Sequence, residues 1–237
     1  ASVGETGVKV KIPLTVAIFS TGDELVLPGK ALKSAQSYNS NRFLIYGLLR
    51  DMGLNVIDLG IVPDDYSKTL AMLSKAVEVA DVIVSSGGVS VGEEDHVKAA
   101  VRALGSVNIW KVAMKPGKPF LLGAINGKPL LGLPGNPVST FVSFFVFAKP
   151  FLKATQGLSE VAPNELYGLS SFDFQAGSRR EYLRGRLRSK HGETWIEKYA
   201  HQGSSVLSSL RWANCLAIVD GAQQIKIGEP IKFIKLD

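Results

Sequence analysis

Strand-like and helix-like segments alternate along roughly the first 155 residues, and this alternation limits the fold more than any other feature. Apolar runs typical of buried strands are separated by segments with helical apolar spacing: strands at 14–19, 55–62 and 81–85, helices at 41–52 and 70–80. Strands and helices that alternate in this way form βαβ units, which place helices on both faces of a mostly parallel sheet. Residues 12–156 are therefore predicted to form a three-layer α/β domain.

The same pattern continues beyond residue 95: a helix at 97–104, strands at 108–113, 120–124 and 129–133, and an apolar helix from 137 to about 155. Asn136 is expected to cap this last helix, with Pro137 at its first position. Its most apolar stretch, residues 141–152, is shorter than the ~20 residues that span a bilayer. No membrane association is therefore expected.

From about Ser170 the helical spacing disappears and short alternating runs replace it. These runs are EYLRGRLR, WIEKYA, CLAIVD, QQIKI and PIKFIKL, with glycine-containing breaks between them. Several short strands of this kind are typical of a sandwich or barrel. Residues 165–237 are predicted to form a small all-β barrel domain, with the boundary near residues 157–165.

Composition narrows the class of partner. The chain has 46% hydrophobic and 20% charged residues, as in ordinary globular proteins, and its single cysteine excludes an internal disulfide. The net charge of +6 favours an anionic partner. The basic segment 179–190 is either a strand with a solvated face or an anion-binding strand. Because no RNA- or DNA-binding motif is present, nucleic acid is not the expected partner.

Polar loops follow several of the predicted strands, at the edge where an open parallel sheet binds its ligands. They read STGDE (20–24), PDD (63–65), SGGVSVGEED (86–95), LPGNP (133–137) and KPGK (115–118). The glycines allow a ligand to approach the backbone closely. Acids beside a phosphate-type loop are compatible with a phosphate when a hard cation such as Mg²⁺ lies between them.

Each loop also has a purely structural interpretation. Asp64 and Asp65 are suited to cap a helix, and the acids at 93–95 favour a helix N-terminus. Lys115 and Lys118 flank a Pro-Gly turn, where lysines are commonly solvated. The convergence of these loops at one sheet edge favours a ligand site over separate structural roles.

Taken in order, the motifs resemble one family. VAIFSTGDEL, NSNR, LGIVPDD, SSGGVSVGEEDHVK, KVAMKPGKPF, GLPGNPVS and HQGSSVLSSL are similar to motifs of the molybdopterin molybdenumtransferases of the MoeA type, which include the C-terminal domain of gephyrin. The resemblance implies a cytoplasmic enzyme that inserts molybdate into adenylylated molybdopterin, releases AMP and requires Mg²⁺. It also implies a homodimer and a molybdopterin adenylyltransferase as a possible partner.

The resemblance also implies roles for particular residues. The implied catalytic residues are Glu24, Asp95, Lys115 and Lys118, and the implied metal ligands are Glu24, one or both of Asp64 and Asp65, and Asp95. The implied substrate-binding residues are Thr21, Gly22, Asp23, Asn41, Ser86, Gly87, Gly88, Ser90, Pro134, Gly135, Asn136, Pro137, Ser139, Arg180, Arg184 and Ser204.

The chain departs from the family pattern in two respects. Asn39 stands where the family often has an aspartate, so one acidic contact is expected to be lost. Family members also carry two further domains before this region, so residues 1–11 are expected to be the remnant of a preceding segment, and the chain a fragment with low activity alone. Two alternatives remain open: a molybdopterin adenylyltransferase, and a non-catalytic molybdopterin-binding scaffold.

Overall fold

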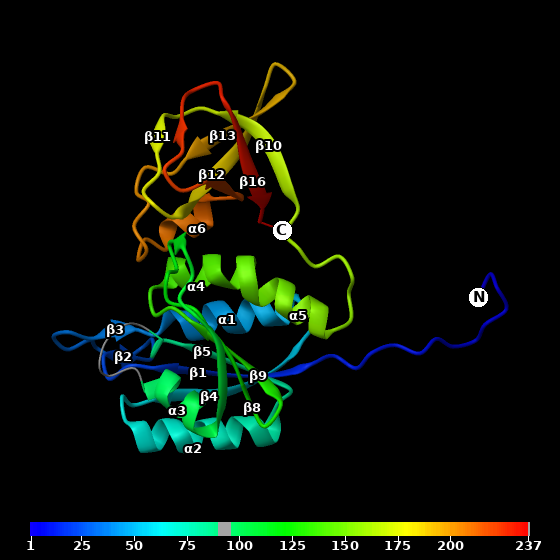
Figure 1. Ribbon diagram of the computed structural model, residues 1–237, viewed down its shortest axis with the longest axis vertical. Helices are drawn as coiled ribbons and strands as arrows, with labels where there is room; N and C mark the ends of the chain where they lie inside the picture. Colours follow the sequence, from blue (N-terminus) through cyan, green and yellow to red (C-terminus); the bar gives the residue numbers. More distant parts are fainter. Residues whose placement is uncertain (90–95, 237) are drawn as a thin grey trace.

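The computed structural model describes residues 1–89 and 96–236, which form two folded parts stacked along the longest axis of the molecule (Figure 1). The lower part in this view is an α/β domain, and the upper part is a β-barrel. The first 14 residues have no helix or strand, and the segment extends away from the α/β domain.

The α/β domain is built on a six-stranded sheet with the order β4-β1-β5-β9-β8-β6. The strands are β1 (Thr15–Thr21), β4 (Asn55–Val62), β5 (Val82–Ser86), β6 (Gly105–Trp110), β8 (Leu121–Ile125) and β9 (Lys128–Leu133). β4, β1, β5 and β9 run parallel, whereas β8 is antiparallel to both of its neighbours. The predicted mostly parallel sheet is therefore confirmed.

Helices cover both faces of this sheet. One face carries α2 (Tyr66–Val79) and α3 (His96–Leu104), and the other carries α1 (Ser40–Asp51) and the helix from Pro137 to Thr155 (Figure 1). Successive side chains of a strand point to opposite faces. In β1, accordingly, Val16 and Ile18 pack with α1, while Ala17 and Phe19 pack with α2. The near-continuous apolar strands are thus explained by burial on both sides.

The helix after β9 separates the sheet from the barrel. It consists of α4 (Pro137–Ser143), a π-helical segment (Phe144–Ala148) and α5 (Lys149–Thr155). Its 19 residues are long and apolar enough to cross a membrane by length and composition, which corrects the estimate from residues 141–152 alone. Half of its most apolar 18-residue stretch is buried inside the protein, and the core helices of soluble proteins are similarly long, apolar and buried.

The second part is a closed barrel, as predicted. Its strands are β10 (Glu165–Ser170), β12 (Arg180–Lys190), β13 (Glu193–Lys198), β14 (Cys215–Val219) and β16 (Pro230–Lys235). β13 pairs with both β10 and β12, and this closes the ring. A short pair, β11 (Phe174–Gln175) with β15 (Gln224–Ile225), and the short helix α6 (Ser208–Trp212) complete this part.

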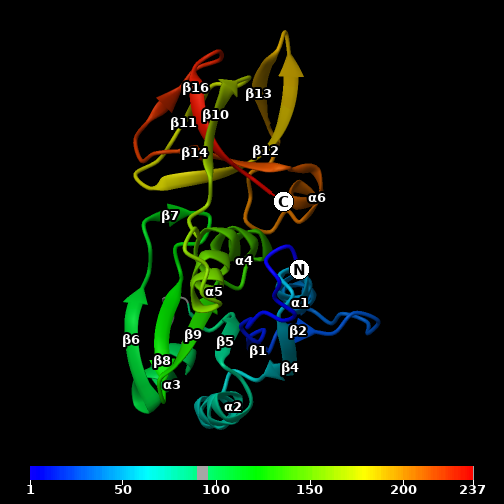
Figure 2. The same cartoon turned by 90° about the vertical axis from the view of Figure 1, so that its right-hand side faces the viewer.

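The two parts share a strand pairing and a core. The strand predicted at 108–113 is in fact β6, which ends at Trp110, and the chain then rises to form β7 (Met114–Lys115) beside β12 of the barrel (Figure 2). The core between sheet and barrel contains Phe145 of the long helix together with Tyr182 and Ile218 of the barrel. The barrel is therefore packed directly onto the α/β domain.

Candidate functional site

A cavity of about 690 Å³ lies at the edge where β1, β5 and β9 end. Four of the five loops predicted to converge, all except KPGK, contribute to it. A small parallel pair that leads into α1 also contributes: β2 (Leu25–Val26) and β3 (Ser37–Tyr38). Its predicted lining residues are Thr21, Gly22, Glu24, Asn41, Asp64, Ser86, Gly87, Gly88, Pro134, Gly135, Asn136, Pro137 and Ser139. A volume of this size is typical of small-molecule sites.

Two glycines after β5 shape the floor of this cavity. Gly87 and Gly88 have φ values of +86° and +63°, in the left-handed region that favours glycine. A Cβ on Gly87 would lie 2.6 Å from the backbone oxygen of Thr21, and one on Gly88 would lie 2.5 Å from Cγ2 of Val97. Side chains at these positions would therefore disrupt the contacts of the β5 loop with the end of β1 and with α3.

The carboxylates of the STGDE and PDD loops occupy different positions. The backbone N–H of Asp64 donates to Oδ1 of Asp23 (3.1 Å), and that of Asp23 donates to Oδ2 of Asp64 (3.3 Å), which ties the two loops together. Asp65 accepts from the N–H of Lys68 (2.7 Å) and caps α2. Only Glu24 and Asp64 of these acids line the cavity. The structural interpretation of Asp65 as a helix cap is thus borne out.

No group of three His, Cys, Asp or Glu side chains arranged to hold a metal is present in residues 1–89 and 96–236. The predicted site residues Ser90 and Asp95 lie outside the described residues. Mg²⁺ is commonly held by one or two carboxylates, with substrate phosphates and waters completing its shell. Glu24 and Asp64 fit that incomplete protein shell.

The structure does not bring the two predicted lysines to the cavity wall. Lys115 Nζ lies 3.2 Å from the carboxylate of Glu181, a barrel residue that is only 4% exposed. Lys118 is exposed, and its carbonyl oxygen accepts from the N–H of Val112. Of the KPGKP turn, only Pro119 lines the cavity. Lys115 therefore joins the barrel to the α/β domain.

Arg184, another residue expected to bind the substrate, does not line the cavity either. It is 1% exposed, and its guanidinium donates to Oγ of Ser209 (3.2 Å) and to the carbonyl of Gly203 (3.0 Å). Burial lowers the pKa of Arg184 to about 10. The adjacent carbonyl of Ser204 accepts from the N–H of Val138, and Ser205 lines the cavity. Arg184 thus positions the barrel loop that borders the site.

Arg180 lies on the surface and pairs with Asp220 (2.7 Å). That hydrogen bond raises the pKa of Arg180 above its ordinary value. Neither Arg180 nor Arg184 lines the cavity, so among the described residues the charged side chains of the wall are the carboxylates of Glu24 and Asp64. The N-terminus of α1, which begins at Ser40 beside the cavity, offers backbone N–H groups to an anion.

Sequence reasoning missed several lining residues: Leu25, Ser37, Tyr38, Asn39, Ser40, Val89, Pro119 and Ser205. Most of them belong to the β2–β3 pair and its exit, whose two-residue strands carry no alternation that a pattern could detect. In the sequence, Asn39 stands out only as a departure from the family pattern. Its position as N-cap of a helix at the sheet edge was the signal that could have placed it in the site.

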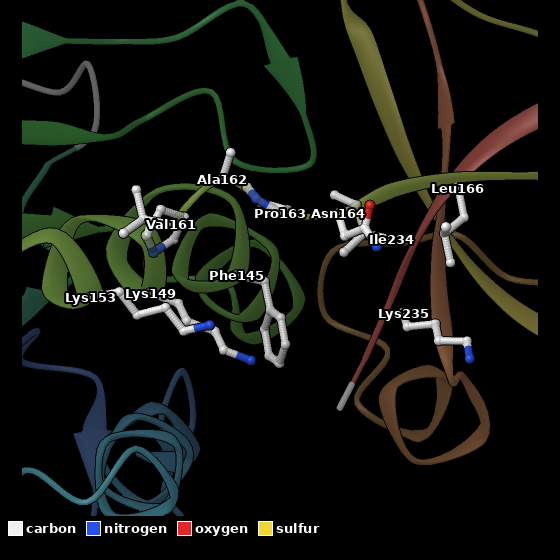
Figure 3. A pocket seen from close by; sticks show the side chains of 11 residues that line it. Phe145, Lys149, Lys153, Val161, Ala162, Pro163, Asn164, Leu166, Ile234 and Lys235 are labelled. Carbon is white, nitrogen blue, oxygen red and sulfur yellow. The ribbon is translucent and has the colours of Figure 1, made fainter. Parts of the chain in front are cut away.

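A second cavity of about 220 Å³ lies between the long helix and the barrel (Figure 3). Its walls are mixed: Phe145 on the helix and Leu166 and Ile234 on the barrel are apolar, whereas Lys153, Asn164 and Lys235 are polar. Lys149, which lies on the helix with Nζ 4.7 Å from the ring of Phe145, also lines it. None of the predicted site residues belongs to this cavity.

Fold and site together define a class: an α/β ligand-binding domain whose glycine-lined, acidic cavity opens at the carboxyl edge of the sheet and is bordered by a barrel. Comparison with known proteins gives the family. The chain belongs to the family of probable molybdopterin binding domains, which matches residues 17–154, and its residues 169–236 match the MoeA C-terminal region (domain IV).

The relatives agree with this assignment. The chain is 37% identical over 235 residues to a molybdopterin molybdenumtransferase of Haemophilus influenzae, covering 98% of this chain and 58% of that protein. It is 35% identical over 237 residues to a protein of the same name from Nostoc, covering 97% and 54%. A crystal structure of a molybdopterin biosynthesis MoeA protein from Pyrococcus horikosii has a TM-score of 0.80 at 28% identity, covering 94% and 54%. The chain thus spans a little over half the length of these relatives.

Proposed function

We propose that this chain forms the catalytic part of a molybdopterin molybdenumtransferase, which inserts molybdate into adenylylated molybdopterin and releases AMP. One observation carries the proposal: the cavity combines a glycine-lined floor with two carboxylates, Glu24 and Asp64, and no basic side chain among its described lining residues. A cavity with this wall accepts a phosphorylated ligand only with a cation. The family and its named relatives supply the identity of that ligand.

In this proposal Glu24 and Asp64 hold Mg²⁺, and Asp95 is a further ligand. The bound metal would supply positive charge to the phosphates at the leaving AMP. The chain's own groups orient the substrate: the close backbone approach at Gly87 and Gly88 admits a phosphate, and the N–H groups at the start of α1 bind it. Asp23, through its mutual hydrogen bonds with Asp64, keeps that carboxylate in position.

Lys115 and Lys118 are proposed to stabilise bound molybdate by their positive charge, although neither is among the described residues that line the cavity. As compact charges, lysines stabilise an anion without bidentate geometry. Lys118 is exposed beside Pro119 at the wall, and Lys115 is shared with Glu181. Ser90, Arg180 and Ser204 remain proposed substrate contacts. We further propose a cytoplasmic protein that acts as a homodimer and receives its substrate from a molybdopterin adenylyltransferase.

The test is release of AMP from adenylylated molybdopterin, measured with and without Mg²⁺ and molybdate. Glu24→Gln and Asp64→Asn remove one charge each from the cavity and should lower the metal-dependent rate by about 10²-fold, while circular dichroism stays unchanged. Asp65→Asn removes the same charge at the cap of α2, outside the cavity, and should retain most of the rate.

Wild-type rates in both the Glu24 and the Asp64 variant would show that the metal site is elsewhere. Consumption of ATP with molybdopterin that is not adenylylated would instead indicate an adenylyltransferase. Binding of adenylylated molybdopterin that is never followed by AMP release, even in the longer protein, would indicate a non-catalytic scaffold.

A further inference from the structure

Gln202 lies where β13 separates from β12, and its side chain takes the place of a strand residue there. The antiparallel register of the two strands ends at Gly185 and Lys198. The N–H of Tyr199 still donates to the carbonyl of Arg184 (3.0 Å). The N–H of Arg184, however, donates to Oε1 of Gln202 (2.9 Å), and Nε2 of Gln202 donates to the Arg184 carbonyl (3.0 Å). A side-chain amide has the same donor and acceptor as a peptide unit, so it can replace one.

The partners of this amide fix its orientation. A backbone N–H can only donate, so the atom that faces the N–H of Arg184 is the oxygen. Nε2 then lies between two carbonyls that can only accept, those of Arg184 (3.0 Å) and Tyr199 (2.9 Å). Glutamate and methionine have side chains of similar length, but neither can make all three hydrogen bonds. The arrangement therefore depends on the amide of Gln202.

The segment that Gln202 fixes is the loop of residues 200–206, which borders the large cavity. Arg184 holds the same loop with its guanidinium, through the carbonyl of Gly203 (3.0 Å). One residue further, the carbonyl of Ser204 accepts from the N–H of Val138 in the first turn of α4 (3.0 Å). The loop thus connects β12 of the barrel to the start of a helix in the α/β domain.

This connection satisfies a backbone donor at the N-terminus of α4. Asn136 is the N-cap of the helix, but its side chain makes no capping hydrogen bond. The carbonyl of Ser204 therefore serves a donor of the kind that capping side chains serve in other helices. Pro134–Pro137, next to this turn, lines the cavity, and so does Ser205 of the loop. The position of the loop consequently determines the position of part of the cavity wall.

We infer that Gln202 is a positioning residue of the proposed reaction: its amide joins the 200–206 loop to β12, and the loop holds Ser205 and the start of α4 at the cavity. The inference rests on the proposed function, in which the barrel and the α/β domain act on one substrate. Gln202 does not itself line the cavity, so it acts through the loop. A displacement of about 1 Å caused by a distant mutation can lower a rate strongly.

Gln202→Met tests this, because it keeps the length of the side chain and removes all three hydrogen bonds. AMP release by the full chain is measured against the concentration of adenylylated molybdopterin, at saturating molybdate. We expect kcat to fall about tenfold or more. KM should stay within about twofold of the wild type, because the floor at Gly87 and Gly88 comes from another loop. Gln202→Glu places a second oxygen against the two carbonyls and should lose at least as much of kcat.

Gln175→Met is the matched control. Nε2 of Gln175 also donates to backbone carbonyls, those of Ala176 (3.2 Å) and Ala222 (3.1 Å). Gln175 belongs to β11 and does not line the cavity, so its variant should keep the kcat and KM of the wild type. Urea denaturation of both variants gives their loss of stability. If Gln202 were merely structural, both variants would lose activity only in proportion to that loss.

Hydrogen exchange measured by mass spectrometry provides a readout that does not depend on turnover. In Gln202→Met, the amides of residues 136–142 and 203–209 should exchange about tenfold faster than in the wild type, because the loop opens locally. The amides of β1 and β5, which lie in the sheet, should exchange as in the wild type. Gln175→Met should leave both of the loop-dependent segments unchanged.

A wild-type kcat in Gln202→Met or Gln202→Glu, equal losses of kcat in Gln202→Met and Gln175→Met, or unchanged exchange in both segments would overturn the inference. A failure of the proposed function looks different. In that case the wild type would release no AMP with molybdate, while exchange in Gln202→Met would still show that Gln202 attaches the loop.

Discussion

At the scale of single residues, burial strongly changes the acidity of Cys215, which lies in the barrel and not in the cavity. It is fully buried on β14, and burial raises the pKa of its thiol to about 12 from the ordinary value of 9.0. The thiolate is the reactive form of cysteine. The side chain is therefore expected to behave as a small apolar group rather than as a nucleophile.

The stability of the protein should fall at alkaline pH because of this thiol. The unfolded chain loses the Cys215 proton near pH 9.0, whereas the folded chain keeps it to about pH 12, so the free energy of unfolding decreases between these values. Within this range the free energy of unfolding falls by at most about 1.4 kcal/mol per pH unit because of this one group. Urea unfolding at several pH values should show a shallower alkaline decline in Cys215→Ala. If the free energy of unfolding falls equally steeply with pH in the wild type and in Cys215→Ala, the raised pKa of Cys215 is contradicted.

Arg184 shows what sequence reasoning cannot see at this scale. The segment 179–190 was predicted to be either a strand with a solvated basic face or an anion-binding strand, but residues 181–185 are all buried. The face is covered because the loop carrying Gly203 and helix α6, with Ser209, pack over it. Alternation predicts which residues share a face, but not whether a distant loop covers that face.

Local signals did suffice for several elements. β4 was predicted at its observed bounds, and α1 was predicted at 41–52, within one residue of the observed Ser40–Asp51, because apolar periodicity is a property of neighbouring residues. β7 was missed. Two residues carry no periodicity, and Met114 and Lys115 form a strand only because β12 lies beside them. The convergence of four of the five polar loops was predictable from the parallel topology, whereas the turning of Lys115 toward Glu181 was not.

The ion pair that accompanies β7 gives a prediction at the scale of the element. Lys115→Met leaves the buried carboxylate of Glu181 with the N–H of Gly177 as its other described partner, so the free energy of unfolding should fall. The decrease should be about 1 kcal/mol, since the Lys115 side chain is 54% exposed and partly screened by water. Urea denaturation measures it.

Lys118→Met is the matched control for this measurement, because Lys118 lies on the same turn and is exposed. Its unfolding free energy should stay within about 0.5 kcal/mol of the wild type. A larger loss of stability in Lys118→Met than in Lys115→Met would show that the pair with Glu181 does not join the two parts.

At the scale of the whole molecule, the shared core makes the two parts depend on each other. Phe145, Tyr182 and Ile218 belong to one cluster that crosses from the long helix to the barrel. Separating the parts would expose this surface to water, at about 25 cal/mol per Å². The α/β domain and the barrel should therefore unfold together rather than in succession.

Tryptophans on both sides of the boundary allow this to be measured. Trp110 lies in the α/β domain, whereas Trp195 and Trp212 lie in the barrel. Urea transitions followed by fluorescence in Trp110→Phe and in a Trp195→Phe, Trp212→Phe double variant should have coincident midpoints once each variant's own stability change is subtracted. Midpoints that still differ between the two variants after this subtraction would show independent domains.

The charge of the cavity wall opposes the charge of the molecule. The chain carries a net charge of +6, yet Glu24 and Asp64 are the charged groups among the described lining residues. In the proposed function, the positive net charge would attract the anionic substrate, while the carboxylates of the wall would repel it until a cation is bound. By thermodynamic reciprocity, each then raises the affinity for the other by the same factor. In the proposed reaction the cavity would thus work as a coincidence detector, filled only when metal and nucleotide are present together.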